Sequence, residues 1–250
     1  GIQMWARLSW TTQLPGICGD SGTGLSQNLS GLVLVSACGN LSALDPDTGE
    51  VRWTFAGGET SRSVPAVDSQ GNLYWGYGTN LVSLTADGAL RWAGIVDANH
   101  VFGSSPVLDD QDHVIFTHDA VLAVSSDGQF FWGAPAYTWL NTSPAIGADG
   151  TIFVSSPDGL WAYSPDGRLI WHDNFAKTPS GYGVSIGDDG TVYAGATGAE
   201  LYAVTAQGQL TWSLTTEESR IIGAGVVIGP PAIGRDGTLY FGTDVYGFAM

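Results

Sequence analysis

A tryptophan recurs along this chain at almost constant intervals, and this spacing restricts the possible folds more than any other feature. Intervals of 43, 39, 40, 39 and 41 residues separate the members of the series, which are Trp10, Trp53, Trp92, Trp132, Trp171 and Trp212. From the second member onward, each ends a shared phrase, Gly-x-apolar-x-Trp, as in residues 167–171. A self-similar unit of about 40 residues, built from short β-type segments, is typical of β-propeller blades.

The copy that ends at Trp171 shows the internal plan of the unit most clearly. Four strands are predicted in it, at residues 143–146, 151–154, 160–163 and 168–171. Asp149-Gly150 separates the first two strands, and Asp166-Gly167 separates the last two. Asp-Gly between alternating apolar segments favours a hairpin, because glycine supplies the positive φ that such turns need. Each repeat is therefore predicted to be a blade of four antiparallel strands.

Two copies depart from this plan. The first copy, around residues 25–35, matches it only loosely. In the third copy, Asp112 stands where the second copy has Gly71. Both copies keep the periodic tryptophan, so the repeat still extends over them.

The two ends of the chain complete one blade between them. The last copy stops at residues 245–250, which match a third strand, and residues 5–10 resemble the missing Trp strand. Pairing these segments would close a ring and remove two exposed edges. We therefore predict one all-β domain over residues 1–250. It is a six-bladed β-propeller of four-stranded antiparallel blades, closed by pairing of the N-terminal strand with the C-terminal blade.

The phrase from Ala43 to Trp53 resembles the pyrroloquinoline-quinone-like (PQQ-like) propeller repeat, whose blades carry Ala-x-Asp-x-x-x-Gly-x-x-x-Trp. The resemblance covers nearly the whole chain and implies that the repeated tryptophan docks between adjacent blades. We accordingly interpret all six periodic tryptophans as inter-blade docking residues rather than a ligand surface. Trp75 and Trp161 fall outside the series on predicted strands and are expected in the core.

The charge of the chain excludes some partners. It has 8 Lys and Arg against 24 Asp and Glu, a formal net charge of −16. Such a surface repels phosphate backbones and anionic membranes, so nucleic acid is not expected as a partner. No run of 18 apolar residues is present, so no transmembrane segment is predicted in this chain. A monomer is expected.

Two cysteines bear on the cellular compartment. In the blade plan, Cys18 lies in the segment leading into the first strand, and Cys38 lies in the loop after the second strand. These two classes of loop share one face of a propeller, which allows a disulfide. An even pair with no other cysteine fits an exported, oxidising location, either periplasmic or extracellular. Two free, buried thiols are the alternative.

Ligands of propellers usually bind where variable loops surround the central channel, because rigid strands display those loops there. The loops leading into the blades supply the candidate binding residues: Arg62, Asp97, His100, Tyr137, Trp139, His172, Asp173, Lys177, Tyr182 and Arg220. The loops between second and third strands add Tyr77, Asn80, His118, Asp119, Asp158, Glu200 and Asp244.

We predict a non-catalytic binding or interaction scaffold of an exported, bacterial-type protein. The channel-side loops would bind a protein or a small molecule, with aromatic residues such as Tyr137 and Trp139 as anchors. No catalytic residue set is recognised, no metal ligand motif is spelled out, and no cofactor is expected.

Two enzyme classes remain as alternatives. A metal-assisted hydrolase or lyase would hold an ion such as calcium in the channel, using His100, His172, Asp97 and Asp173. A PQQ-dependent dehydrogenase would need basic groups around its tricarboxylate cofactor. The Trp strands hold four of the arginines, which places them away from the channel: Arg7, Arg52, Arg91 and Arg168.

Overall fold

The computed structural model describes eleven stretches of the chain: residues 10–14, 24–37, 39–59, 61, 63–95, 103–135, 142–173, 183–196, 200–215, 229–242 and 247–249. They belong to two compact units, Gly1–Phe102 (unit 1) and Gly103–Met250 (unit 2), and each is considered by itself. Regular structure in the described stretches consists of strands alone. No helix in them is long and apolar enough to cross a membrane.

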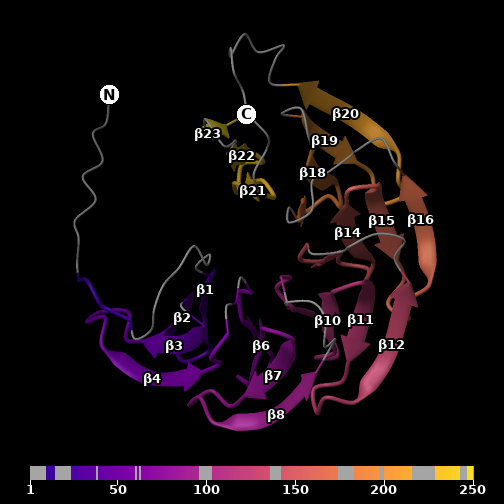
Figure 1. Ribbon diagram of the computed structural model, residues 1–250. Helices are drawn as coiled ribbons and strands as arrows, with labels where there is room; N and C mark the ends of the chain where they lie inside the picture. The colour runs from indigo at the N-terminus through magenta and orange to yellow at the C-terminus, as the bar shows by residue number, and fades with distance from the viewer. Residues whose placement is uncertain are drawn as a thin grey trace, which may run out of the picture. The chain divides into compact units, whose positions relative to one another are not determined.

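Unit 1 contains two antiparallel sheets of four strands, each in chain order (Figure 1). The first sheet comprises β1 (Gly24–Gln27), β2 (Val33–Ala37), β3 (Asn40–Leu44) and β4 (Val51–Ala56). The second comprises β5 (Ala66–Val67), β6 (Leu73–Tyr77), β7 (Asn80–Leu84) and β8 (Leu90–Ile95). The loosely matching first copy thus forms a complete sheet.

Unit 2 contains three further four-stranded antiparallel sheets and one of three strands. The first comprises β9 (Val107–Leu108), β10 (Val114–Thr117), β11 (Ala120–Val124) and β12 (Phe130–Pro135). The second comprises β13 (Ala145–Ile146), β14 (Ile152–Ser156), β15 (Gly159–Tyr163) and β16 (Leu169–Asp173). The third comprises β17 (Val184–Ile186), β18 (Val192–Ala196), β19 (Glu200–Val204) and β20 (Leu210–Thr215). The three-stranded sheet comprises β21 (Ala232–Ile233), β22 (Leu239–Gly242) and β23 (Gly247–Ala249).

The prediction of an all-β chain of antiparallel blade-like sheets is confirmed. The copy ending at Trp171 forms four strands close to the predicted ones, although β16 continues to Asp173. The last copy supplies three strands, and its third, β23, lies inside the predicted 245–250. Of the segment expected to complete this sheet, residues 5–10, only Trp10 lies within the described residues.

The middle strands of most sheets are buried along almost their whole length, so both of their faces pack against other side chains. In unit 1 a buried cluster joins Leu34 and Leu41 of the first sheet to Leu73, Trp75 and Val82 of the second. In unit 2 a comparable cluster includes Ile115, Val154 and Trp161, so the two tryptophans expected in the core, Trp75 and Trp161, lie there. Full burial of one such side chain contributes about 1.5–3 kcal/mol.

Each four-stranded sheet has an irregularity in the register between its third and fourth strands. Around Trp171, Ala162 pairs with the tryptophan but Tyr163 pairs with Leu169, so Ile170 is an extra residue in β16. The same shift occurs beside the other tryptophans, and the extra residues are Arg52, Arg91, Phe131 and Thr211. A bulge of this kind bends its strand and redirects the neighbouring side chain.

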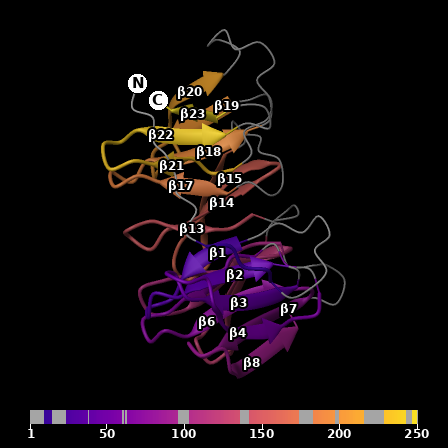
Figure 2. The same ribbon diagram turned by 90° about the vertical axis from the view of Figure 1, so that its left-hand side faces the viewer.

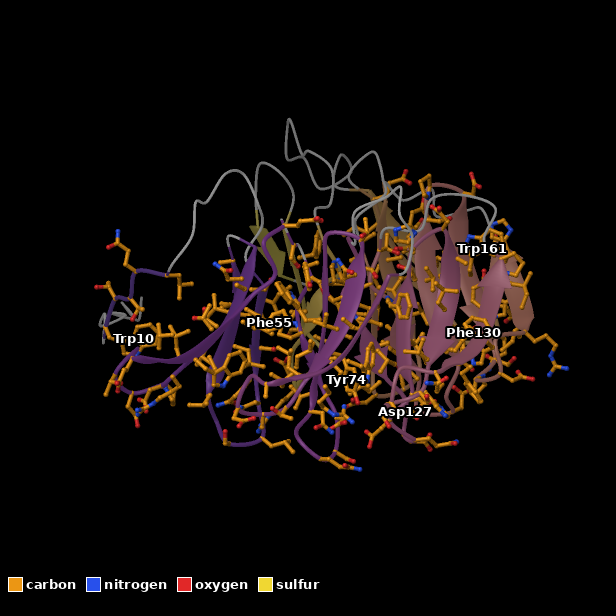
Figure 3. All side chains as sticks on the ribbon, turned by 60° about the horizontal axis from the view of Figure 1, so that its bottom comes forward. Trp10, Phe55, Tyr74, Asp127, Phe130 and Trp161 are labelled. Atoms are coloured by element: carbon orange, nitrogen blue, oxygen red, sulfur yellow. The ribbon has the colours of Figure 1, made fainter. Side chains whose placement is uncertain are left out.

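Three periodic indoles, those of Trp10, Trp53 and Trp171, contact the turn that precedes the next Trp strand. The Trp53 Nε1 donates to the Ala86 carbonyl at 3.2 Å, and the Trp171 Nε1 donates to the Ala206 carbonyl at 2.8 Å. Trp10, which lies at one edge of unit 1 in Figure 3, donates in the same way to the Pro46 carbonyl at 2.8 Å.

A glycine lies beneath the indole at each of these contacts. A Cβ added to Gly208 would stand 2.8 Å from the Trp171 ring, and one added to Gly167 would stand 2.4 Å from the Trp132 ring. The φ angles of Gly167 and Gly208 are 80° and 84°. This explains the glycine of the repeated phrase, because the position requires both a left-handed backbone and room for the indole.

A second ring packs on the tryptophan from inside the same sheet. Tyr74 and Trp92 have ring centroids 6.0 Å apart at 47°, and Tyr193 and Trp212 repeat that geometry. Tyr240 of β22 occupies the corresponding strand position and is 50% exposed.

Candidate functional site

Two of the ten predicted binding residues, His172 and Asp173, lie within the described residues. They were expected in a channel-side entry loop, but they are the last two residues of β16, because the Trp strand continues two residues beyond Trp171. The remaining eight lie outside the described residues: Arg62, Asp97, His100, Tyr137, Trp139, Lys177, Tyr182 and Arg220. Cys18 and Cys38 also lie outside them, so the disulfide stays a prediction.

His172 lies against a buried aromatic side chain. It is directly opposite Trp161 in the β15–β16 pairing, and the two rings stack with centroids 3.7 Å apart at 20°. Directly opposed side chains are the closest neighbours across an antiparallel ladder. The imidazole Nε2 lies 3.3 Å from the Asp158 carbonyl oxygen. His172 itself is exposed, so the contacts orient an imidazole whose other surface meets solvent.

Trp161 is fixed by hydrogen bonds beneath this imidazole. Its Nε1 donates to the Ser156 Oγ at 2.9 Å, and the Asp158 backbone N donates to the same oxygen at 3.2 Å. Trp161 is 3% exposed and Ser156 is fully buried, which makes this a rigid support. We call the set Ser156, Asp158, Trp161 and His172 the aromatic ledge; Trp161 lies toward the top of unit 2 in Figure 3.

Asp173 follows the ledge at the end of β16. It pairs with Leu160 across the ladder and is half-buried. The strand thus presents an imidazole and a carboxylate from consecutive residues, which point to opposite faces of the sheet. They are not a nucleophile and base in contact.

Unit 1 has an aromatic cluster at the matching end of its second sheet. Tyr77 stacks on Trp75 with centroids 5.0 Å apart, and Phe55 meets both rings edge-on. Burial, with a smaller contribution from the charge of Glu59, raises the pKa of Tyr77. This phenol is therefore a neutral hydrogen-bonding group at ordinary pH.

The other candidates in loops between second and third strands are separate from the ledge. His118 is 7% exposed, and its Nδ1 lies 3.8 Å from the Asp119 carboxylate. Tyr202 donates a hydrogen bond to Glu200, and burial together with this bond raises its pKa to about 12.

The described residues do not contain a group of three or more His, Cys, Asp or Glu side chains arranged to hold a metal ion. Two arginines of the Trp strands make contacts within their own sheets. Arg52 pairs with Asp45 at 2.7 Å and with Glu50 at 3.1 Å, and Arg91 donates to Ser83 at 2.7 Å.

Sequence reasoning missed the support under His172. Trp161 was expected only as a core residue, and Ser156 was not singled out. A signal was present, because residues that pair across a hairpin can be counted outward from the Pro165-Asp166-Gly167 turn. A bulge at Ile170 changes that count by one, and the sequence does not reveal the bulge.

Repeated four-stranded antiparallel sheets with tryptophan contacts at fixed places define a repeat protein of the β-propeller class. The family model described as outer membrane protein assembly factor BamB matches residues 37–132 and 87–246. The chain therefore belongs to this family of PQQ-like repeat propellers.

Solved structures agree on the fold. BamB from Moraxella catarrhalis has a TM-score of 0.69 and 18% identity, covering 96% of this chain and 74% of that one. A streptogramin B lyase has a TM-score of 0.67 and 15% identity, covering 89% and 76%. An inactive H270A virginiamycin B lyase from Staphylococcus aureus, solved with quinupristin, has a TM-score of 0.70 and 13% identity, covering 89% and 78%. A search of curated proteins gave no sequence match.

Proposed function

We propose that this chain is a non-catalytic binding scaffold that takes part in assembling envelope proteins, with a protein as its partner. The family match over residues 37–246 carries the proposal, because the matching model is described as an outer-membrane assembly factor. The aromatic ledge supports it, since an exposed side chain on a rigid aromatic base is suited to contact a partner. The predicted loop residues that lie outside the described stretches, from Arg62 to Arg220, would extend this surface around a central channel.

A closed six-bladed ring of residues 1–250 is part of the proposal. Trp10 makes the contact with Pro46 that Trp53 makes with Ala86, so Trp10 behaves as the Trp of a preceding sheet. Tyr240 is half-exposed where Tyr193 packs on a tryptophan of its own sheet. Both observations are accounted for if residues 5–10 form the fourth strand beside β23.

Deleting residues 1–10 tests the closure. The shortened chain should unfold at lower denaturant and self-associate, because β23 would present an open edge. Analytical ultracentrifugation and a urea titration measure the two effects. A monomer with unchanged stability would contradict the closed ring without bearing on the partner.

The partner is tested by affinity capture of the tagged full chain from the envelope of its host, followed by mass spectrometry and titration with each purified candidate. His172→Glu should weaken a true complex by about tenfold, since a carboxylate replaces a stacked imidazole at the contact. Arg168→Gln, an exposed change in the β15–β16 turn, is the matched control. Equal affinity for both variants would remove the ledge from the binding surface.

An enzyme would be revealed by different measurements. Disappearance of quinupristin on incubation would favour a lyase, and stoichiometric calcium in the purified protein would favour a metal-assisted reaction. Stabilisation by PQQ with calcium would favour a dehydrogenase. Our proposal expects none of these outcomes, and any one of them would contradict it.

We also propose a periplasmic or extracellular location, with Cys18 and Cys38 joined in a disulfide. Thiol titration of the denatured, unreduced protein should find no free thiol. Two free thiols would overturn the disulfide, and fractionation of the host cell tests the location separately.

A further inference from the structure

Unit 2 contains a cavity of about 460 Å³ at the opposite end of the strands from the aromatic ledge. Two equivalent turns form its walls, residues 187–190 between β17 and β18 and residues 234–237 between β21 and β22. Ile186, Tyr193 and Ile233 supply its apolar surface. The volume falls within the range of about 300–1,000 Å³ that is typical of small-molecule sites.

The walls of the cavity are held in place by both sheets. The Ser185 hydroxyl donates to the Pro231 carbonyl, which joins β17 to the segment before β21; these strands are neighbours in Figure 2. The Tyr193 ring packs on Trp212 with centroids 6.0 Å apart, and it contacts the cluster formed by Leu201, Leu239 and Phe241. A preformed cavity of this kind avoids much of the ordering cost of binding.

The last carboxylate of each turn is used within that turn. Asp189 accepts the Thr191 backbone N–H at 3.0 Å, and Asp236 accepts the Thr238 backbone N–H at 3.1 Å. The backbone hydrogen bonds from these threonines lower the pKa of Asp189 and of Asp236. Both carboxylates are therefore structural.

The residue that precedes each of these structural carboxylates is not used within the turn. Asp188 and Arg235 occupy the same position in their turns, where the turn of the β13–β14 hairpin has Ala148. Both are exposed and line the cavity, and neither has an ion-pair partner within the described part of the chain. The opening of this cavity thus carries one negative and one positive side chain beside its apolar surface.

We propose that this cavity binds a small zwitterion with an apolar side chain, whose ammonium group meets Asp188 and whose carboxylate meets Arg235. The aliphatic part of the ligand packs against Ile186 and Ile233. A free hydrophobic amino acid and a short hydrophobic peptide share this chemistry.

Simpler ligands match the cavity less well. Asp188 and Asp189 repel an inorganic anion, and Arg235 repels an inorganic cation. A neutral apolar molecule would leave both charges at the mouth partly desolvated without a partner, which costs free energy. Only an apolar ligand that carries both charges uses the anion Asp188, the cation Arg235 and the apolar surface of the cavity together.

Isothermal titration calorimetry of the full chain tests the proposal with L-leucine, L-leucyl-L-leucine, N-acetyl-L-leucine amide and glycine betaine. L-leucine, L-leucyl-L-leucine or both should bind. The one that binds more tightly shows whether the ligand is a free amino acid or a short peptide. The uncharged amide and the betaine, which lacks an apolar side chain, should bind at least about tenfold more weakly.

Arg235→Gln and Asp188→Asn should each weaken the zwitterion by about tenfold or more, as expected for loss of a hydrogen bond to a charged group. Arg168→Gln and Asp110→Asn are exposed controls of matching charge and should leave affinity unchanged. Thermal unfolding of each variant verifies that it folds. Absence of binding at millimolar concentration, equal binding of the amide, or unchanged affinity of both cavity variants would overturn the proposal. None of these results concerns the envelope-assembly function, which depends on the other end of the strands.

Discussion

The two ends of the strands in unit 2 are built differently. At the turn end, residues 147–150, 187–190 and 234–237 repeat one hydrogen-bond pattern, in which the first glycine N–H donates to the residue after the turn. At the loop end, the β10–β11 and β14–β15 connections both end in aspartate, Asp119 and Asp158, but they begin differently, with His118 in one and Pro157 in the other. The backbone of the turn end is therefore fixed by local chemistry, whereas the loop end is free to vary around a constant frame.

Among the test substitutions, leaving the controls aside, the largest expected effect is at the turn end, where a tryptophan covers a glycine. Gly167→Ala should lower the free energy of unfolding by about 3 kcal/mol, because a left-handed backbone and a blocked Cβ add their costs. Gly190→Ala is the matched control, since its φ is 81° and nothing lies within 4 Å of an added Cβ. It should cost only about 1–2 kcal/mol. Equal losses in urea denaturation would show that the Trp132 ring moves aside without cost.

A turn of unit 1 provides the next largest effect. Asp68 is 3% exposed and accepts hydrogen bonds from the Asn72 backbone at 2.7 Å, the Asn72 amide at 2.8 Å and the Tyr74 hydroxyl at 2.8 Å. Asp68→Asn should cost about 2 kcal/mol at neutral pH, because the charge-assisted bonds are lost. Asp47→Asn, an exposed change in the same unit, should have little effect.

The loss at Asp68 should depend on pH in a defined direction. Burial opposes ionisation, but the hydrogen bonds from Asn72 and Tyr74 outweigh it and lower the pKa of Asp68. A lowered folded-state pKa means that the stabilisation is complete above the unfolded value of about 3.9 and is lost as pH falls through the folded value. The difference between the native chain and Asp68→Asn should therefore shrink below about pH 4. A constant difference down to lower pH would contradict this account.

A smaller effect, of opposite sign, is expected at Asp112. It has a φ of 61° where the equivalent Gly71 has 88°, and it is the one non-glycine residue with positive φ in the described chain. Asp112→Gly should raise the free energy of unfolding by about 0.5–1 kcal/mol by relieving this conformation. Asp110→Gly in the same turn should not stabilise. A destabilised Asp112→Gly protein would indicate that the carboxylate has a compensating role.

The smallest effect on stability is expected at the loop end. His172→Ala should change the free energy of unfolding by less than about 0.5 kcal/mol, since the imidazole is exposed and Trp161 keeps its bond to Ser156. Trp161→Ala should cost about 3–5 kcal/mol, as a truncated core aromatic does, which controls for the measurement. A large loss of unfolding free energy for His172→Ala would show that the histidine is needed for the stability of its sheet.

The contrast between the two ends also explains what the sequence could predict. The Asp-Gly turns and the Trp spacing determine strand order and number within each repeat, because each depends on a few neighbouring residues. The irregular first copy still forms a sheet, since its middle strands bury Leu34 and Leu41 in the same way as the corresponding strands of other copies. The three strands of the last copy were also foreseen.

The site was less predictable for a physical reason. Loop residues carry no periodic signal, so the sequence could nominate them only by position. His172 was found in this way, but its stacking on Trp161 depends on a cross-strand pairing that a bulge displaces. The opposed charges of Asp188 and Arg235 were overlooked because they are variations within a turn that the pattern treats as constant.

The bulges beside the tryptophans have a consequence for solubility. The outermost strands of unit 2 expose large apolar side chains, among them Phe130, Leu169 and Leu210, on edges that could recruit other chains. An extra residue interrupts the even spacing of backbone donors and acceptors on each of these edges, so a foreign strand cannot pair along its length. The bulge beside each tryptophan thus also opposes fibril-like pairing between edge strands. These strands can therefore expose apolar side chains without promoting aggregation.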